Sequence, residues 1–229
     1  MTQSPRDPSR SNTASTARLG ASHGLTLAHA ALPASGRGPG VLVLSDGAIE
    51  RRDGDLLADA CRRLTRHGFV ALAPRLPEVD ADALHDTERR VVDAGIEQLF
   101  NEDATEGSRV GVIGFGRGGW LALEAAARGA RVGLVVQAGG GSSGESETLP
   151  LATLEAPVFS VFGEKDPLVE AGRASEWLRR MRDEGIASEL RVQPGAEAVF
   201  FDPVLADRFD AVAAQGFWDA ALARLRAEL

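Results

Sequence analysis

Glycine fills four of the last six positions of RVGVIGFGRGG at 109–119. The residues before them, 109–113, form a short and mostly β-branched run that predicts a buried strand, and the residues after them are good helix formers. A strand, a glycine turn and a helix in this order are typical of two sites. One is the dinucleotide fingerprint G-x-G-x-x-G, which Gly114, Gly116 and Gly119 match. The other is a nucleophile elbow, where a Ser or Cys at the middle of the turn attacks a carbonyl.

The dinucleotide interpretation requires an acidic residue at the end of the next strand, about 20 residues on, to bind the ribose hydroxyls. Gln137 holds that place and lacks the charge. Two strand–helix units also precede the glycine turn, whereas the fingerprint belongs to the first strand of its fold. A dinucleotide-binding module therefore stays an alternative hypothesis.

The elements that must position the turn alternate along the chain from about residue 24. Short apolar runs predict buried strands at 41–44, 69–73, 109–113, 132–137 and 158–162. Apolar stripes at helical spacing predict helices at 56–66, 87–100, 170–183 and 209–228. The stretch 78–86 is polar and predicts a loop. This alternation predicts the α/β class, with a mostly parallel sheet covered by helices on both faces.

The N-terminal stretch differs from the rest of the chain. Residues 1–23 are rich in Ser, Thr, Arg, Pro and Ala and lack apolar periodicity. Such a composition predicts a disordered tail, because little apolar surface is available to bury. We expect a single domain at 24–229.

The composition limits the function classes. A net charge of −8 argues against a nucleic-acid surface. The apolar runs are too short to span a bilayer, and no secretory signal is recognised. Cys61 is the only cysteine, and no His, Asp or Glu pair has convincing metal-ligand spacing. We therefore expect a cytoplasmic protein with no cofactor, no metal and no nucleic-acid or membrane partner.

Five segments, in order and spacing, resemble the dienelactone hydrolase family of α/β-hydrolases. They are VLVLSDG at 41–47, GFVALAPRL at 68–76, GFGRGG at 114–119, FGEKDPLV at 162–169 and PGAEAVFFDP at 194–203. The last is similar to the histidine loop of that family, usually P-G-A-G-H-x-F. The resemblance implies an α/β-hydrolase fold in one domain.

The same resemblance implies an incomplete catalytic triad. The nucleophile position falls on Gly116, which has no oxygen or sulfur to attack a carbonyl. The acid position falls on Asp166 and is retained, whereas the histidine position falls on Ala198. No histidine follows Asp166, where a nucleophile–acid–histidine order requires one. Since a nucleophile needs an adjacent base, family-type ester or lactone hydrolysis is not expected.

The ligand-binding part of the site does not depend on those side chains. By resemblance, the backbone N–H groups of Arg117 and Gly47 form the oxyanion hole. A helix that begins near Arg117 also directs its positive dipole end at the pocket. We therefore expect a small ligand that is anionic or contains a carbonyl.

Four side chains near this site have two interpretations each. The Arg117 side chain adds a charge to the pocket or is solvent-exposed at a helix start. Asp46 aligns with a family carboxylate near the nucleophile or forms a turn. Asp166 acts as a base or structures its loop. Glu197 is a general base acting through water, or a surface residue of a relaxed loop.

Three functional hypotheses follow. The leading one is a pseudoenzyme that binds a small ligand or acts through an unidentified protein partner. The second is an active hydrolase with displaced chemistry that uses Glu197, Asp166 or Asp46. The third is the dinucleotide-binding module described above.

Overall fold

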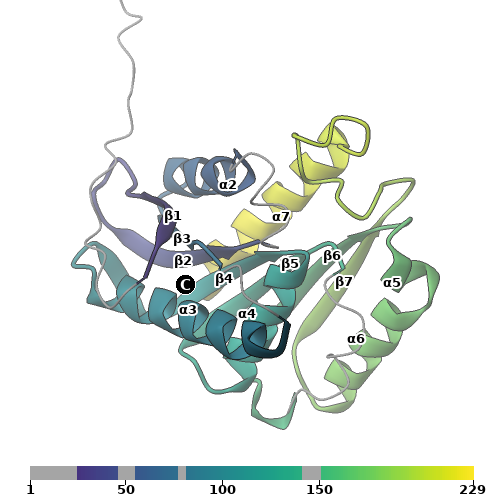
Figure 1. Ribbon diagram of the computed structural model, residues 1–229, viewed down its shortest axis with the longest axis horizontal. Coiled ribbons are helices and arrows are strands. Elements are labelled where there is room, and N and C mark those ends of the chain that lie inside the picture. Colours follow the sequence, from purple (N-terminus) through teal and green to yellow (C-terminus); the bar gives the residue numbers. More distant parts are fainter. Residues whose placement is uncertain (1–24, 46–54, 77–80, 141–150) are drawn as a thin grey trace, which may run out of the picture.

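A computed structural model describes residues 25–45, 55–76, 81–140 and 151–229 (Figure 1). Its seven-stranded sheet has the order β1-β3-β2-β4-β5-β6-β7, in which only β1 is antiparallel to its neighbour. The strands are β1 Leu27–Ala31, β2 Gly38–Leu44, β3 Val70–Pro74, β4 Thr105–Phe115, β5 Val132–Ala138, β6 Val158–Gly163 and β7 Ser188–Gln193. The helices are α2 Asp55–Arg66, α3 Ala81–Asn101, α4 Arg117–Ala127, the 3-10 turn η2 Leu151–Thr153, α5 Pro167–Glu170, α6 Arg173–Asp183 and α7 Ala211–Glu228.

Helices cover both faces of the sheet, as the alternating pattern predicts. Figure 1 shows α2 and α7 on one face and α3, α4 and α6 on the other. Neighbouring residues of β2 separate accordingly, because successive side chains of a strand point to opposite faces. Val41 and Val43 belong to the core cluster under α2 and α7, whereas Leu42 and Leu44 belong to the cluster under α3 and α4. The described residues form one doubly covered α/β domain.

One helix begins earlier than its apolar stripe predicts. The polar stretch expected as a loop at 78–86 is helical from Ala81 onward, within α3. The sequence ADALHDTERR is polar but rich in good helix formers. A polar helix turn needs no apolar stripe, so hydrophobic periodicity does not detect it.

The sequence also predicts a disordered N-terminal tail and no segment that spans a membrane. The tail predicted at 1–23 lies outside the described residues. Among the residues that the structure describes, no helix is both long enough and apolar enough to cross a membrane.

Candidate functional site

The turn between β4 and α4 has the backbone of an elbow. Gly116 lies between the last strand residue, Phe115, and the first helical residue, Arg117. Its φ of 55° and ψ of −124° fall where L side chains are strained. The Gly116 N–H donates to the Ala138 carbonyl at the end of β5 (2.9 Å). Gly116 is therefore the tip of a sharp strand–turn–helix connection at the carboxyl ends of the strands.

The neighbouring glycines allow α4 to approach the sheet closely. A Cβ on Gly118 would lie 2.6 Å from the Leu44 carbonyl oxygen, and one on Gly114 would overlap the backbone of Gly118 and Gly119. A Cβ on Gly119 would overlap the Gln137 side chain. These glycines are required for packing between β4, α4 and β2, whether or not a nucleotide is bound.

Gln137 occupies the position expected for the ribose-binding acid of a dinucleotide site. Its side chain is buried under α4 and accepts a hydrogen bond from the Ser160 hydroxyl (3.1 Å). The side chain is therefore directed into the core between β5 and β6. This placement does not favour the dinucleotide hypothesis.

Asp166 is buried and structures its loop. It is the N-cap of α5, and its Oδ1 accepts from the Leu168 N–H (2.9 Å). Its Oδ2 accepts from the Gly140 N–H, just after β5 (2.6 Å). Burial raises the pKa of Asp166, and these two hydrogen bonds only partly offset that effect.

The loop at 194–203 also reaches the end of β5. A Cβ on Gly139 would lie 2.7 Å from the Ala198 carbonyl oxygen. Gly116, Ala198 and Asp166 thus contact three consecutive residues, which are Ala138, Gly139 and Gly140. The structure therefore brings together the three residues that the sequence predicts at the triad positions.

Glu197 turns away from this meeting point. Its carboxylate pairs with the Lys165 ammonium at 2.7 Å, and both side chains are substantially exposed (38% and 54%). The hydrogen bond that the Lys165 ammonium donates to Glu197 raises the pKa of Lys165. A surface ion pair of this kind gives no support to Glu197 as a general base.

The Arg117 side chain differs from both of its predicted placements. Its Nε lies 3.0 Å and 3.1 Å from the two carboxylate oxygens of Glu88, and Nη2 lies 2.7 Å from Oε2. The two side chains are 19% and 4% exposed. The guanidinium is therefore paired inside the fold, which makes it neither solvent-exposed nor an uncompensated charge in the pocket.

Sequence reasoning missed two polar residues near the elbow. Glu88 belongs to a run of charged residues on α3, and no local pattern marks its burial. Ser45 directly follows β2 and is 2% exposed, with no hydrogen-bond partner for its hydroxyl among the described residues. Its neighbours Asp46 and Gly47, both predicted at the site, lie outside the described residues.

The site shows no metal-binding cluster in the described ranges of the chain. Within those ranges, His, Cys, Asp and Glu form no group of three or more that could hold a metal ion.

The sheet order, the two helical layers and the elbow at Gly116 define the α/β-hydrolase class of protein. The chain belongs to the dienelactone hydrolase family, whose model matches residues 27–229. The sequence prediction of fold and family is therefore confirmed.

Individual relatives agree with this assignment. The chain is 29% identical to a probable 2-oxo-3-(5-oxofuran-2-ylidene)propanoate lactonase of Bradyrhizobium sp., over 87% of this chain and 88% of that protein. It is 27% identical to a dienelactone hydrolase-like promiscuous phosphotriesterase from metagenomic libraries, with a TM-score of 0.67 and coverage of 83% and 86%. A putative dienelactone hydrolase of Klebsiella pneumoniae has the same fold, with a TM-score of 0.70, 21% identity and coverage of 89% and 97%.

Proposed function

We propose that this chain is a pseudoenzyme of the dienelactone hydrolase family that binds a small lactone, ester or carboxylate at the elbow without hydrolysing it. The observation that carries the proposal is Gly116 at the elbow tip, where the backbone conformation is present and the side chain is absent. The name of the Bradyrhizobium relative supports lactones as the ligand class.

Hydrolysis requires groups that these triad positions lack. Gly116 offers no nucleophile, and Ala198 offers no base to activate one. Removing triad members from other enzymes leaves only about 10³–10⁴-fold acceleration over water. We therefore expect turnover far below an ordinary enzymatic rate.

Binding relies on backbone groups that remain. Arg117 is the first residue of α4, so its N–H lies at the positive end of the helix dipole. An N–H at a helix start, with the aligned helix dipole behind it, favours a carbonyl oxygen or an anion. The ion pair with Glu88 anchors this residue from its side-chain end.

The Arg117 backbone donor can be tested apart from its side chain. Proline is tolerated at the first position of a helix and has no N–H, so Arg117→Pro removes the donor. Arg117→Ala is the matched control, because it removes the same ion pair and keeps the donor. A γ-lactone and its open carboxylate serve as probes, with affinity measured by calorimetry and turnover by product analysis.

We expect saturable binding to the wild type without turnover. Arg117→Ala should bind within about threefold of the wild type, and Arg117→Pro at least about tenfold more weakly, the effect of one strong hydrogen bond. Lactone turnover above about 1 s⁻¹ would contradict the proposal. So would absent binding, or equal binding by both variants.

The displaced-chemistry alternative has one favourable observation, the raised pKa of Asp166, which makes its carboxylate a better base. Both of its oxygens are already engaged by backbone N–H groups. If the wild type does hydrolyse a lactone and Asp166→Asn abolishes that activity, this alternative replaces the pseudoenzyme.

A reducing compartment fits the cysteine content. Cys61 of α2 is buried in the protein core, and burial raises the pKa of its thiol to about 12. Such a thiol is inert, and a single cysteine can form no disulfide within the chain, so we propose that the protein works in a reducing compartment, the cytoplasm.

A further inference from the structure

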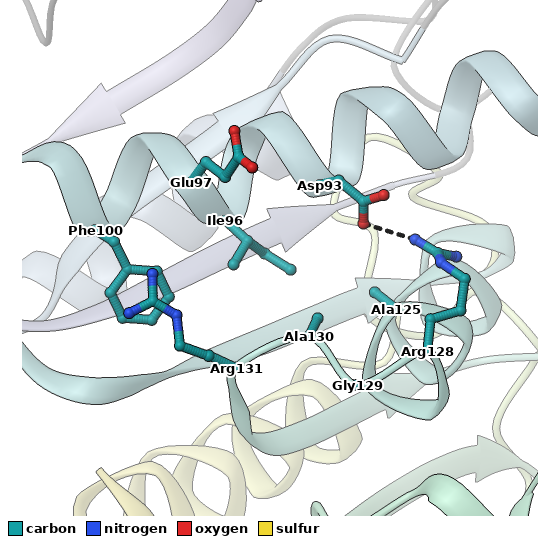
Figure 2. A pocket seen from close by; sticks show the side chains of 9 residues that line it. All are labelled: Asp93, Ile96, Glu97, Phe100, Ala125, Arg128, Gly129, Ala130 and Arg131. Atoms are coloured by element: carbon teal, nitrogen blue, oxygen red, sulfur yellow. Dashed lines mark hydrogen bonds and ion pairs between the residues drawn. The ribbon is translucent and has the colours of Figure 1, made fainter.

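A cleft lies away from the elbow, between the C-terminal half of α3 and the turn that joins α4 to β5 (Figure 2). Its volume is about 380 Å³, which is within the usual range for small-molecule sites. The cleft adjoins the last residues of α4, whereas Gly116 precedes the first. A helix of 11 residues is about 16 Å long, so the two sites are separate.

Apolar side chains form the middle of the cleft. Figure 2 shows Ile96 of α3 directed toward Ala130, with Ala125 beside them. Charged side chains stand on either side of this apolar centre. A ligand with a short aliphatic body would cover the centre and leave its polar groups at the charged margins.

One margin is already neutralised. Arg128 pairs with Asp93 at 2.6 Å and with Glu124 at 3.6 Å. These two carboxylates neutralise the charge of Arg128 and hold its guanidinium in place. This margin therefore acts as a wall of the cleft and does not offer a binding charge.

The opposite margin carries an arginine held by an aromatic ring. The guanidinium carbon of Arg131 lies 3.4 Å from the ring centre of Phe100. Across the described residues, Arg131 forms no ion pair with a carboxylate. A guanidinium stacked on a ring keeps its N–H edge available, and that edge matches the two oxygens of a carboxylate.

An exposed acid, Glu97, lines the same cleft, one turn of α3 before the ring on which Arg131 is stacked. Glu97 precedes Phe100 by three residues on α3, so the two side chains are neighbours on one helix surface. Glu97 has no ion-pair partner in the part of the chain that the structure describes, Arg131 included. The cleft thus holds an acid and a base that form no ion pair among the described residues.

The charges that line the cleft sum to zero. Asp93 and Glu97 balance Arg128 and Arg131. A purely anionic ligand at Arg131 would meet the Glu97 charge, and a purely cationic ligand at Glu97 would meet Arg131. A dipolar ligand satisfies both unpaired groups at once.

We propose that this cleft binds a free α-amino acid with an aliphatic side chain. The carboxylate accepts hydrogen bonds from the Arg131 guanidinium, and the ammonium donates to the Glu97 carboxylate. The side chain packs on Ile96 and Ala130. This site is independent of the elbow and of the function proposed for it.

Three ligands of one shape test the proposal on the full chain. L-leucine carries both charges, 4-methylpentanoate lacks the ammonium, and isopentylamine lacks the carboxylate. Each is titrated into ¹⁵N-labelled protein at 150 mM salt, and the amide signals of Gly129 and Ala130 report on the cleft. We expect saturable leucine binding, and affinity at least about tenfold lower for each ligand that lacks a charge.

Matched variants separate the cleft from general surface effects. Arg131→Gln and Glu97→Gln should each weaken leucine binding at least about tenfold. The control for Arg131 is Arg180→Gln, since Arg180 also lies over an aromatic ring, that of Trp177 (5.4 Å), on another helix. The control for Glu97 is Glu176→Gln on α6. Both controls should bind leucine as the wild type does.

Three results would overturn the proposal. One is the absence of saturable leucine binding up to about 10 mM. Another is binding of 4-methylpentanoate or isopentylamine as tight as that of leucine, which would indicate a site for a single charge. The third is leucine binding that shifts amides around Gly116 and leaves Gly129 and Ala130 unchanged.

Discussion

At the scale of single residues, Gly116 has a backbone conformation that any L side chain would hold only with strain. Its φ of 55° is combined with a ψ of −124°. A non-glycine residue in such a region costs about 1–3 kcal/mol, which the surrounding fold must supply. Glycine at this position therefore spares the turn that strain.

The first prediction tests that strain. Gly116→Ser should lower the free energy of unfolding by about 1–3 kcal/mol while the protein stays folded, as measured by urea denaturation. Gly216→Ser is the control, because Gly216 lies inside α7 with only the Gln193 side chain near its Cβ position. There serine should be neutral or slightly stabilising. A neutral effect at Gly116 would show that this residue is not an elbow tip.

The second prediction concerns Asp166 and pH. Burial raises the pKa of this carboxyl in the folded state above its ordinary value near 3.8. The folded state then holds the proton more tightly than the unfolded chain, so this residue's contribution to stability falls as pH rises from 3.8 through the raised pKa. Relative to the wild type, Asp166→Asn should therefore gain stability over that window, as followed by urea denaturation at a series of pH values.

A difference between the two proteins that is constant from pH 3.5 to pH 7 would contradict this prediction. Glu170→Gln, on the same short helix, is a useful comparison. Its charge contributes to the Asp166 shift as the smallest of the four causes. It should reproduce only a minor part of the pH effect.

At the scale of elements, the Glu88–Arg117 pair joins α3 to the start of α4. The carboxylate is 4% exposed and accepts from both Nε and Nη2 of the arginine. The pair connects the helix that follows the elbow to a neighbouring helix on the same face of the sheet. It therefore contributes to the stability of the contact between α3 and α4.

The third prediction breaks this pair. Glu88→Gln should lower the free energy of unfolding by about 3 kcal/mol, because the Arg117 charge stays partly buried without its partner. Glu88→Gln combined with Arg117→Gln should recover part of that loss. Asp183→Asn breaks the exposed α6 pair with Arg179 and should cost less than about 1 kcal/mol. Equal costs for Glu88→Gln and Asp183→Asn would show that burial of the first pair is unimportant.

The fourth prediction concerns the glycine turn as a packing element. Two of its glycines pack closely against other parts of the fold: Gly118 lies against the end of β2, and Gly119 lies against the Gln137 side chain. NADH at millimolar concentration should therefore not bind. Saturable quenching of tryptophan fluorescence by NADH, lost in Gly116→Val, would show instead that the turn binds a dinucleotide.

At the scale of the whole molecule, three distant parts of the chain meet at the end of β5. The elbow, the start of α5 and the loop after β7 reach Ala138, Gly140 and Gly139 respectively. Parallel strands with right-handed connections put such loops at one edge of the sheet. The fold thus brings together the three positions that we propose correspond to the catalytic triad of the family, Gly116, Asp166 and Ala198.

The fifth prediction rebuilds a triad at these three positions. Gly116→Ser alone should hydrolyse no p-nitrophenyl ester above the wild-type level, since no base accepts its proton. Combined with Ala198→His it should yield a weak esterase, because Asp166 can then orient the new histidine. Adding Asp166→Asn should remove most of that activity. An esterase that survives the third substitution would show that Asp166 does not act in the rebuilt site.

Local patterns were sufficient for much of this description. The apolar runs, the glycine turn and the order of five motifs predicted the doubly covered sheet, the elbow and the family. The start of α3 was missed, because its first turns are polar and carry no hydrophobic period.

Only the tertiary structure decided which partners the side chains have. Arg117 and Glu88 lie 29 residues apart, and Lys165 and Glu197 lie 32 apart. Asp166, which follows β6, accepts a hydrogen bond from the backbone N–H of Gly140, which follows β5. A sequence pattern reports the residue types within a few turns or strand positions. Pairing across the sheet depends on how distant segments approach one another, and that approach is determined by packing of the whole core.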